Sequence, residues 1–152
     1  MKKVIPMLWY DSGAVEAVTF YTSLIEGSGI DDIQYYPDGR LFSVRFHLGD
    51  LHLTAIDGGP HFKFTEAISL MLLCKDQAEL DEKWAAISDG GEELAMGWLK
   101  DRWGLTWQVI PEKMDEWLLK ANPGQSKRIW AAMEKQPKPN FADLEAAMEE
   151  PK

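Results

Sequence analysis

The chain has 152 residues, of which 45% are hydrophobic and 27% are charged, enough for one globular domain with its own core. Its formal net charge of -9 disfavours binding to nucleic acid or to an anionic membrane surface, since both carry phosphate groups. No apolar stretch approaches the ~20 residues of a membrane span, and the N-terminal apolar run, interrupted at Pro6, is too short for a signal peptide. The one cysteine, Cys74, cannot form an internal disulfide. We therefore expect a cytoplasmic protein in which Cys74 is a buried, inert residue.

The first 57 residues show strand and helix patterns in the order β-α-β-β-β. Apolar residues at spacings of three and four predict an amphipathic helix, for which Ser12 is a plausible N-cap. Strict alternation along 41–48 predicts a half-buried strand, and turn residues separate it from its neighbours. The predicted elements are a strand over 4–10, a helix over 14–25, and strands over 33–36, 41–48 and 51–56.

A second unit repeats this order after about 60 residues. A wholly apolar strand over 67–74 precedes a helix that ends at Ser88 and has Asp76 as its N-cap. Strands are predicted over 93–98 and 107–110, and the segment between them leaves room for one more strand. The internal repeat is the most informative feature of the organisation.

Residues 112–152 differ, because their apolar residues follow helical spacing throughout. They predict three helices, near 114–118, 129–133 and 141–148, separated by proline-containing turns. The apolar stripes of these helices must cover either the sheet or a second subunit.

Three segments, PMLWYDSGAVEAVTFY (6–21), DGGPHFKFTEAISL (57–70) and GWLKDRWGLTWQVIP (97–111), resemble a known family. They are similar to the PhnB-like branch of the glyoxalase/bleomycin-resistance (vicinal oxygen chelate) superfamily, a branch often labelled 3-demethylubiquinone methyltransferase-like. The resemblance covers about 3–111. It implies an α+β fold of two βαβββ modules, about 1–59 and 60–111, curled around a cavity and assembled as a homodimer. Residues 112–152 are then a helical extension of the same domain.

Metal-dependent members of the superfamily place one His or Glu ligand on each of four strands. The resemblance puts Pro6, His52, Ser69 and Gln108 at those positions, with a register uncertainty of two residues at His52. Of these, only His52 is a competent ligand for a borderline divalent metal. His47, which alternates with Arg45 on a polar strand face, is expected to be solvated. We therefore predict no metal and no cofactor.

The same register directs His52, Thr54, Ser69, Thr106 and Gln108, together with the apolar Leu8, toward the cavity. A mostly apolar hollow with a few hydrogen-bonding groups is typical of a small-molecule site. The alternative is that the strand ends pack shut and the polar groups satisfy one another. Trp9 and three other tryptophans near strand ends form either a stacking surface for a planar or cationic ligand or ordinary core and dimer contacts.

Two functions from different classes remain open, and a third is weaker. The chain is either a metal-independent protein that binds a small, partly apolar molecule, or an enzyme (lyase, isomerase or transferase) with His52 as general base. The weaker alternative is a dimeric scaffold without a ligand. The methyltransferase label is not supported, because the glycine pairs at Gly27 and Gly58 lack the strand-turn-helix context of a nucleotide site.

Overall fold

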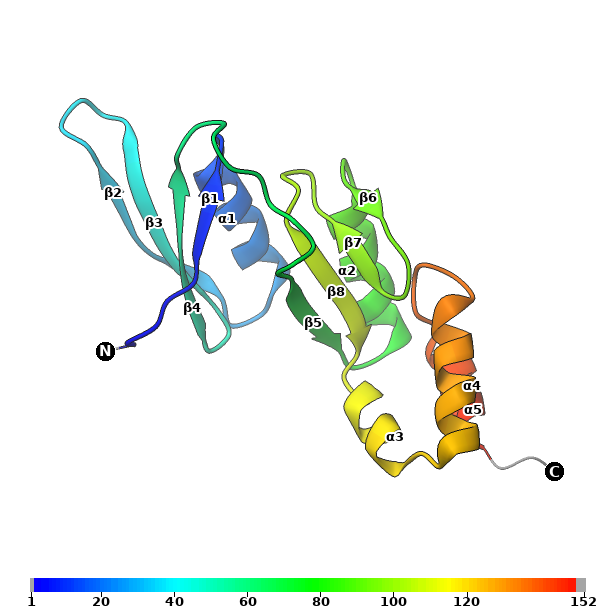
Figure 1. Cartoon of the computed structure of the whole chain (residues 1–152). Coiled ribbons are helices and arrows are strands. Elements are labelled where there is room, and N and C mark those ends of the chain that lie inside the picture. Colours follow the sequence, from blue (N-terminus) through cyan, green and yellow to red (C-terminus); the bar gives the residue numbers. More distant parts are fainter. Residues whose placement is uncertain (1, 150–152) are drawn as a thin grey trace. The chain divides into compact units, whose positions relative to one another are not determined.

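The computed structural model describes residues 2–149, and the chain divides into two compact units, one up to Phe64 and one from Thr65 onward. Each unit holds one four-stranded sheet and one helix between its first and second strands, as Figure 1 shows. The α+β class and the repeated order predicted from the sequence are confirmed. No helix within residues 2–149 is long and apolar enough to cross a membrane.

Unit 1 consists of four strands and one helix. The sheet has the order β1-β4-β3-β2, in which β1 runs parallel to β4 and the other pairs are antiparallel. The elements are β1 (Met7–Tyr10), α1 (Ala14–Leu24), β2 (Gly29–Tyr35), β3 (Leu41–Leu48) and β4 (Leu51–Asp57).

The core of unit 1 lies between α1 and one face of this sheet. Val44 and Phe46 of β3 and Ala55 of β4 have no exposed surface, and Tyr21 of α1 is equally buried. Because side chains alternate along a strand, the residues between these positions must point to the opposite face. The alternation seen in the sequence of β3 therefore fixes which of its side chains remain accessible.

The start of α1 differs from the prediction that Ser12 caps it. The N-cap is Gly13, whose φ of 82° lies in the left-handed region, and no side chain of the cap accepts a hydrogen bond. Instead, the Ala14 amide donates to the Asp57 carboxylate at 2.8 Å. A carboxylate at a helix N-terminus is favourable for the helix dipole, so the end of β4 takes the role predicted for Ser12.

Strand β2 begins at Gly29, four residues before the predicted start of its strand. Its sequence, GIDDIQY, is polar and its residues are mostly exposed, so an apolar pattern does not reveal it. It pairs along β3 at the edge of the sheet, with a register shift between Ile30 and Asp32. This shift leaves Asp31 as an extra residue in the strand.

Unit 2 repeats the arrangement, with sheet order β5-β8-β7-β6 and β5 parallel to β8. Leu80, Trp84 and Ile87 form the buried stripe of α2, and Asp76 accepts the Glu79 amide at 2.9 Å, so the predicted N-cap is confirmed. The single strand predicted over 93–98 is wrong, since two short strands flank a turn there. The elements are β5 (Leu70–Cys74), α2 (Gln77–Ser88), β6 (Glu92–Glu93), β7 (Trp98–Lys100) and β8 (Thr106–Pro111).

One buried carboxylate organises the turn between β7 and β8. Asp101, 3% exposed, accepts hydrogen bonds from the amides of Trp103 and Leu105 at 2.9 and 3.0 Å and from the indole of Trp107 at 3.0 Å. These charge-assisted bonds offset the cost of burying the carboxylate. They also fix Trp107 in the core of unit 2.

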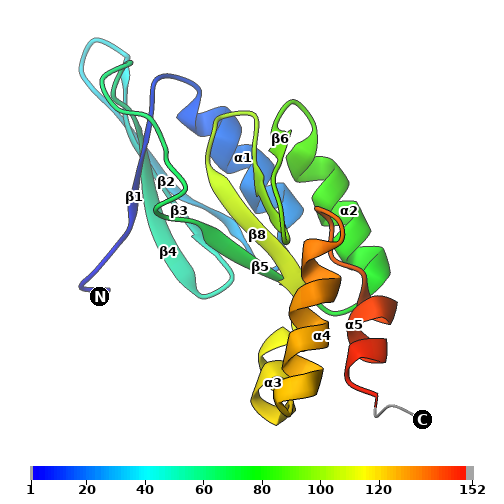
Figure 2. The same cartoon turned by 45° about the vertical axis from the view of Figure 1, so that its right-hand side comes forward.

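Three helices follow the second sheet: α3 (Met114–Lys120), α4 (Pro123–Glu134) and α5 (Phe141–Ala147). Helices α4 and α5 lie side by side in Figures 1 and 2. Ile129 and Leu144 from these helices pack with Met114 and with Ile110 at the end of β8. The helical stripes therefore cover one another and the end of the second sheet.

The burial of Cys74 predicts low thiol reactivity. Desolvation raises the pKa of this thiol from 9.0 to about 12, so the thiolate is depleted about 1000-fold in the folded chain relative to the unfolded one. The raised pKa favours folding below pH 9.0, and this contribution is lost as the pH rises toward 12. We expect slow reaction with an aromatic disulfide reagent at pH 8 and fast reaction in denaturant. A native rate within tenfold of the denatured rate would contradict this expectation.

Candidate functional site

The face of the first sheet that α1 does not cover carries several polar side chains. Thr54 pairs in register with Arg45, and His52 pairs with His47, so these four residues share one face. Met7 and Trp9 of β1 lie opposite Thr54 and Ile56 of β4 and extend the same face. We call this surface the open face of unit 1.

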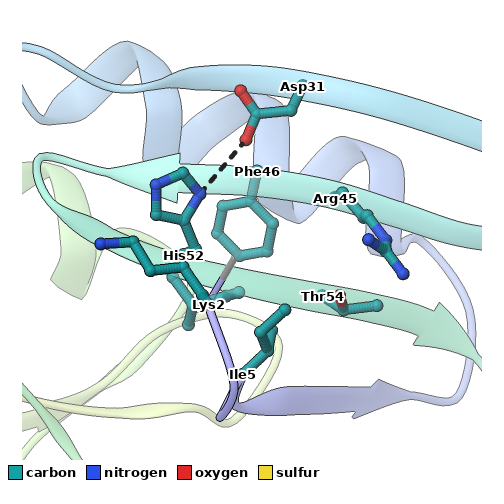
Figure 3. A pocket seen from close by; sticks show the side chains of 8 residues that line it. Lys2, Ile5, Asp31, Arg45, Phe46, His52 and Thr54 are labelled. Atoms are coloured by element: carbon teal, nitrogen blue, oxygen red, sulfur yellow. Dashed lines mark ion pairs between the residues drawn. The ribbon is translucent and has the colours of Figure 1, made fainter.

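A pocket of about 440 Å³ lies on the open face. This volume is within the range of small-molecule sites in proteins. Figure 3 shows how its lining side chains come from three strands and from the segment that precedes β1. The lining residues are Lys2, Ile5, Asp31, Arg45, Phe46, His52, Leu53 and Thr54.

Asp31 lies between two histidines at one end of this pocket. Its Oδ1 is 2.8 Å from Nδ1 of His47, and its Oδ2 is 3.8 Å from Nδ1 of His52. The two imidazole rings are 5.7 Å apart between centroids. Figure 3 shows Asp31 directed from β2 toward His52 on β4. One carboxylate therefore faces two imidazoles and leaves Nε2 of His52 outside these contacts.

Sequence reasoning did not identify this Asp31–His47–His52 cluster. His47 was expected to be solvated, but it bonds to Asp31 and its side chain is 30% exposed. Asp31 precedes the strand predicted over 33–36, so its place in the sheet could not be assigned. The only signal in the sequence is the adjacent pair Asp31-Asp32, which is unusual within a strand.

Arg45 and Thr54 both line the pocket. Thr54 is 8% exposed, and its backbone amide donates to the Pro6 carbonyl at 3.0 Å. Within residues 2–149, neither Arg45 nor Lys2 makes an ion pair. Asp32 is the register partner of Arg45, but its carboxylate accepts a hydrogen bond from the side-chain amide of Gln34 at 3.0 Å. The guanidinium group is thus available to a ligand.

Two residues predicted for this region lie elsewhere. Leu8 is buried and pairs in register with Ala55, one residue beyond Thr54 in β4, so it packs in the core on the opposite face. Pro6, predicted at the first ligand position, does not line the pocket, whereas its neighbour Ile5 does. The predicted register of the first strand is therefore offset by one residue, which reverses the face of every side chain.

The other three predicted site residues belong to unit 2. Gln108 of β8 donates from Nε2 to Oγ of Ser69 at 3.0 Å, so the structure brings these two together. Thr106 is fully buried, and within residues 2–149 its hydroxyl has no hydrogen-bond partner. Its register partner Lys100 is paired with Glu66, and this contact lowers the pKa of the Glu66 carboxyl below its ordinary value.

The residues at the positions that the resemblance assigned to metal ligands do not fit a divalent metal. Ile5, which lines the pocket where Pro6 was predicted, has no side-chain donor, and the neutral Ser69 and Gln108 side chains bind such ions weakly and bond to each other here. Across the described residues, no three His, Cys, Asp or Glu side chains are arranged to hold a metal ion. The donor set leaves His52 as a single imidazole, so we derive no metal-dependent step.

Residues 2–110 match the family model described as 3-demethylubiquinone-9 3-methyltransferase. Among solved structures, a PhnB protein from Bacillus cereus is 29% identical with a TM-score of 0.67, over 72% of this chain and 99% of that one. Protein PA1353 from Pseudomonas aeruginosa is 17% identical with a TM-score of 0.60, over 73% of this chain and 98% of that one.

Glyoxalase I of Leishmania major shares the fold at 18% identity, with a TM-score of 0.53 over 76% of this chain and 90% of that one. No curated protein matches the chain. The family match spans both sheets, and the fold agrees with the two-module architecture. The chain belongs to the family described as 3-demethylubiquinone-9 3-methyltransferase, and it has a glyoxalase-like fold.

Proposed function

We propose that the protein binds a small, partly apolar molecule on the open face of unit 1 without a metal ion, as a cytoplasmic homodimer. The observation that carries this proposal is the pocket of about 440 Å³ around His52 and Thr54. Its lining combines apolar side chains such as Ile5 with the guanidinium group of Arg45 and the hydroxyl group of Thr54. This combination supports burial of an apolar body whose orientation is fixed by a few polar contacts.

The proposal predicts ligands whose binding maps to this pocket. In a screen of small metabolites by protein-observed NMR, at least one compound is expected to shift the backbone amides of Arg45, His52 and Thr54 saturably. Arg45→Met is expected to lower the affinity for compounds that bear an anionic group by about tenfold or more, since a charge-assisted hydrogen bond is lost.

The matched control is Arg102→Met in unit 2, where the side chain is paired with Asp89 instead of lining the pocket. This variant is expected to leave affinities unchanged. A broad screen in which no compound shifts the pocket amides contradicts the proposal.

A second candidate function is catalysis by His52 as a general base. The specific observation in its favour is the Asp31 carboxylate, 3.8 Å from Nδ1 of His52. A carboxylate that hydrogen-bonds one imidazole nitrogen orients the ring and leaves the other nitrogen to take a proton from a substrate, and this bond is often longer in a ligand-free site than in the complex. Proton abstraction adjacent to a carbonyl group is a reaction of this type and requires no metal.

Catalysis is tested on any compound that binds the pocket, by following its conversion with NMR. His52→Ala is expected to lower turnover by about 10²–10⁴-fold, whereas His61→Ala, in a loop outside the pocket, should leave it unchanged. A His52→Ala variant with full turnover, or a wild-type protein that converts none of its bound compounds, rejects the catalytic role and leaves binding as the function.

We do not extend the methyl transfer named in the family description to this chain. Methyl transfer from S-adenosylmethionine commonly uses a parallel sheet with a glycine-rich turn between a strand and a helix. Each sheet here contains one parallel pair, β1 with β4 and β5 with β8. The turn after β1 leads into α1 through Gly13 alone, and its helix N-terminus is occupied by Asp57.

We propose the homodimer because each unit exposes large apolar side chains. Met7 in unit 1 and Ile68, Met71 and Leu73 in unit 2 are between 48% and 60% exposed. Exposed apolar surface is a feature of protein–protein interfaces and supports this proposal. We expect sedimentation to give twice the chain mass of 17.3 kDa, and Met71→Lys to shift the protein toward the monomer. A persistent 17.3 kDa species in the wild type contradicts the dimer.

A further inference from the structure

A second pocket, of about 450 Å³, lies at the end of the first sheet where β3 begins and β1 and β4 end. Trp9, Tyr36 and Phe42 contribute three aromatic rings to it, and Ile56 of β4 contributes to its apolar lining. We propose that this aromatic pocket is a stacking site for a planar aromatic ring of a small molecule. It shares no lining residue with the pocket around His52, so the proposal does not depend on the function proposed above.

Trp9 is held rigidly in one orientation. Its indole Nε1 donates to the Gly59 carbonyl at 3.0 Å, and its ring meets the edge of Phe62 with centroids 5.0 Å apart at 81°. Gly58 lies directly against the indole, since a Cβ at this position would be 2.2 Å from ring carbon Cε2. Because Gly58 has no side chain, its backbone packs directly against the indole, so a ligand meets a ring that these contacts already hold in place.

The opposite wall comes from the hairpin between β2 and β3. Tyr36 and Phe42 have ring centroids 5.3 Å apart and tilted by 55°, and each of these side chains is 47% exposed. Half-exposed aromatic rings that face a pocket offer π surface to a ligand, and aromatic pairs prefer offset or edge contacts at such separations. The pocket thus presents ring faces and edges instead of flexible aliphatic chains.

The charged groups at the rim are already engaged. The Arg40 guanidinium is 2.7 Å from Asp38 and lies 5.3 Å from the centroid of the Tyr36 ring. The Asp57 carboxylate accepts the Ala14 amide at 2.8 Å. Since both charges have partners, recognition is left to the aromatic walls, which favour a planar ring over a charged or aliphatic group.

The test compares 2-naphthol with decahydro-2-naphthol, which has the same hydroxyl and carbon skeleton but no planar ring. The titrations follow the indole N–H resonance of Trp9 by NMR, identified as the signal that disappears in Trp9→Leu. We expect 2-naphthol to shift this resonance saturably and to bind about three- to tenfold more tightly than its saturated counterpart.

Variants at half-exposed positions keep the test independent of folding. Phe42→Leu and Tyr36→Leu are expected to lower the affinity for 2-naphthol several-fold. Gly58→Ala is expected to lower it as well, because the added methyl group displaces the indole. Trp130→Leu on α4, a tryptophan of similar exposure (42%) outside the pocket, is the matched control and should bind 2-naphthol normally.

Three outcomes overturn the proposal: equal affinity for the two compounds, no saturable shift of the Trp9 resonance, or full binding by Phe42→Leu and Tyr36→Leu. If 2-naphthol shifts only the amides of His52 and Thr54, the stacking site is rejected while binding at the first pocket stands. If 2-naphthol shifts the Trp9 resonance alone and no compound in the broad screen shifts the amide of His52, the stacking site stands and the function proposed for the first pocket is rejected.

Discussion

The covering of each sheet on only one face is the constraint on which the rest of the structure depends. A single helix, α1 or α2, packs on a four-stranded sheet in each unit and buries one set of alternating side chains. The other set cannot join that core, because successive residues of a strand point to opposite faces. The pocket around His52 results from this geometry, and so does the exposure of Trp9 and Ile56 to the second pocket.

The open face of unit 1 is polar at one end and aromatic at the other. The Asp31–His47–His52 cluster lies at the first end, and Trp9, opposite Ile56, lies at the second. Thr54 and Ile56 are two residues apart in β4, about 7 Å at the rise of a strand. Fixed polar contacts and a supported indole are both features of preorganised sites, in which little conformational freedom is lost on binding.

The sequence predicted several features because their causes are local. Apolar spacing predicted the helix over 14–25, which is α1, and the Asp76 cap follows from the preference of a short carboxylate side chain for a helix start. The predicted register placed His52 and Thr54 together on one face of the sheet, but it placed Leu8 on the wrong face. An error of one residue in the register moves every side chain of a strand to the opposite face. The role of Asp57 as the acceptor at the start of α1 could not be predicted from the sequence, since 43 residues separate it from Ala14.

The sequence by itself determined the two-module repeat and the α+β class, because hydrophobic periodicity depends only on residue order and type. Tertiary structure alone decided that Asp31 meets His47 and His52, and that Gly58 supports Trp9. The first depends on a register shift at an edge strand, and the second on a backbone approach between segments about 50 residues apart. Such contacts are set by strand pairing, which leaves no periodic signal in the chain.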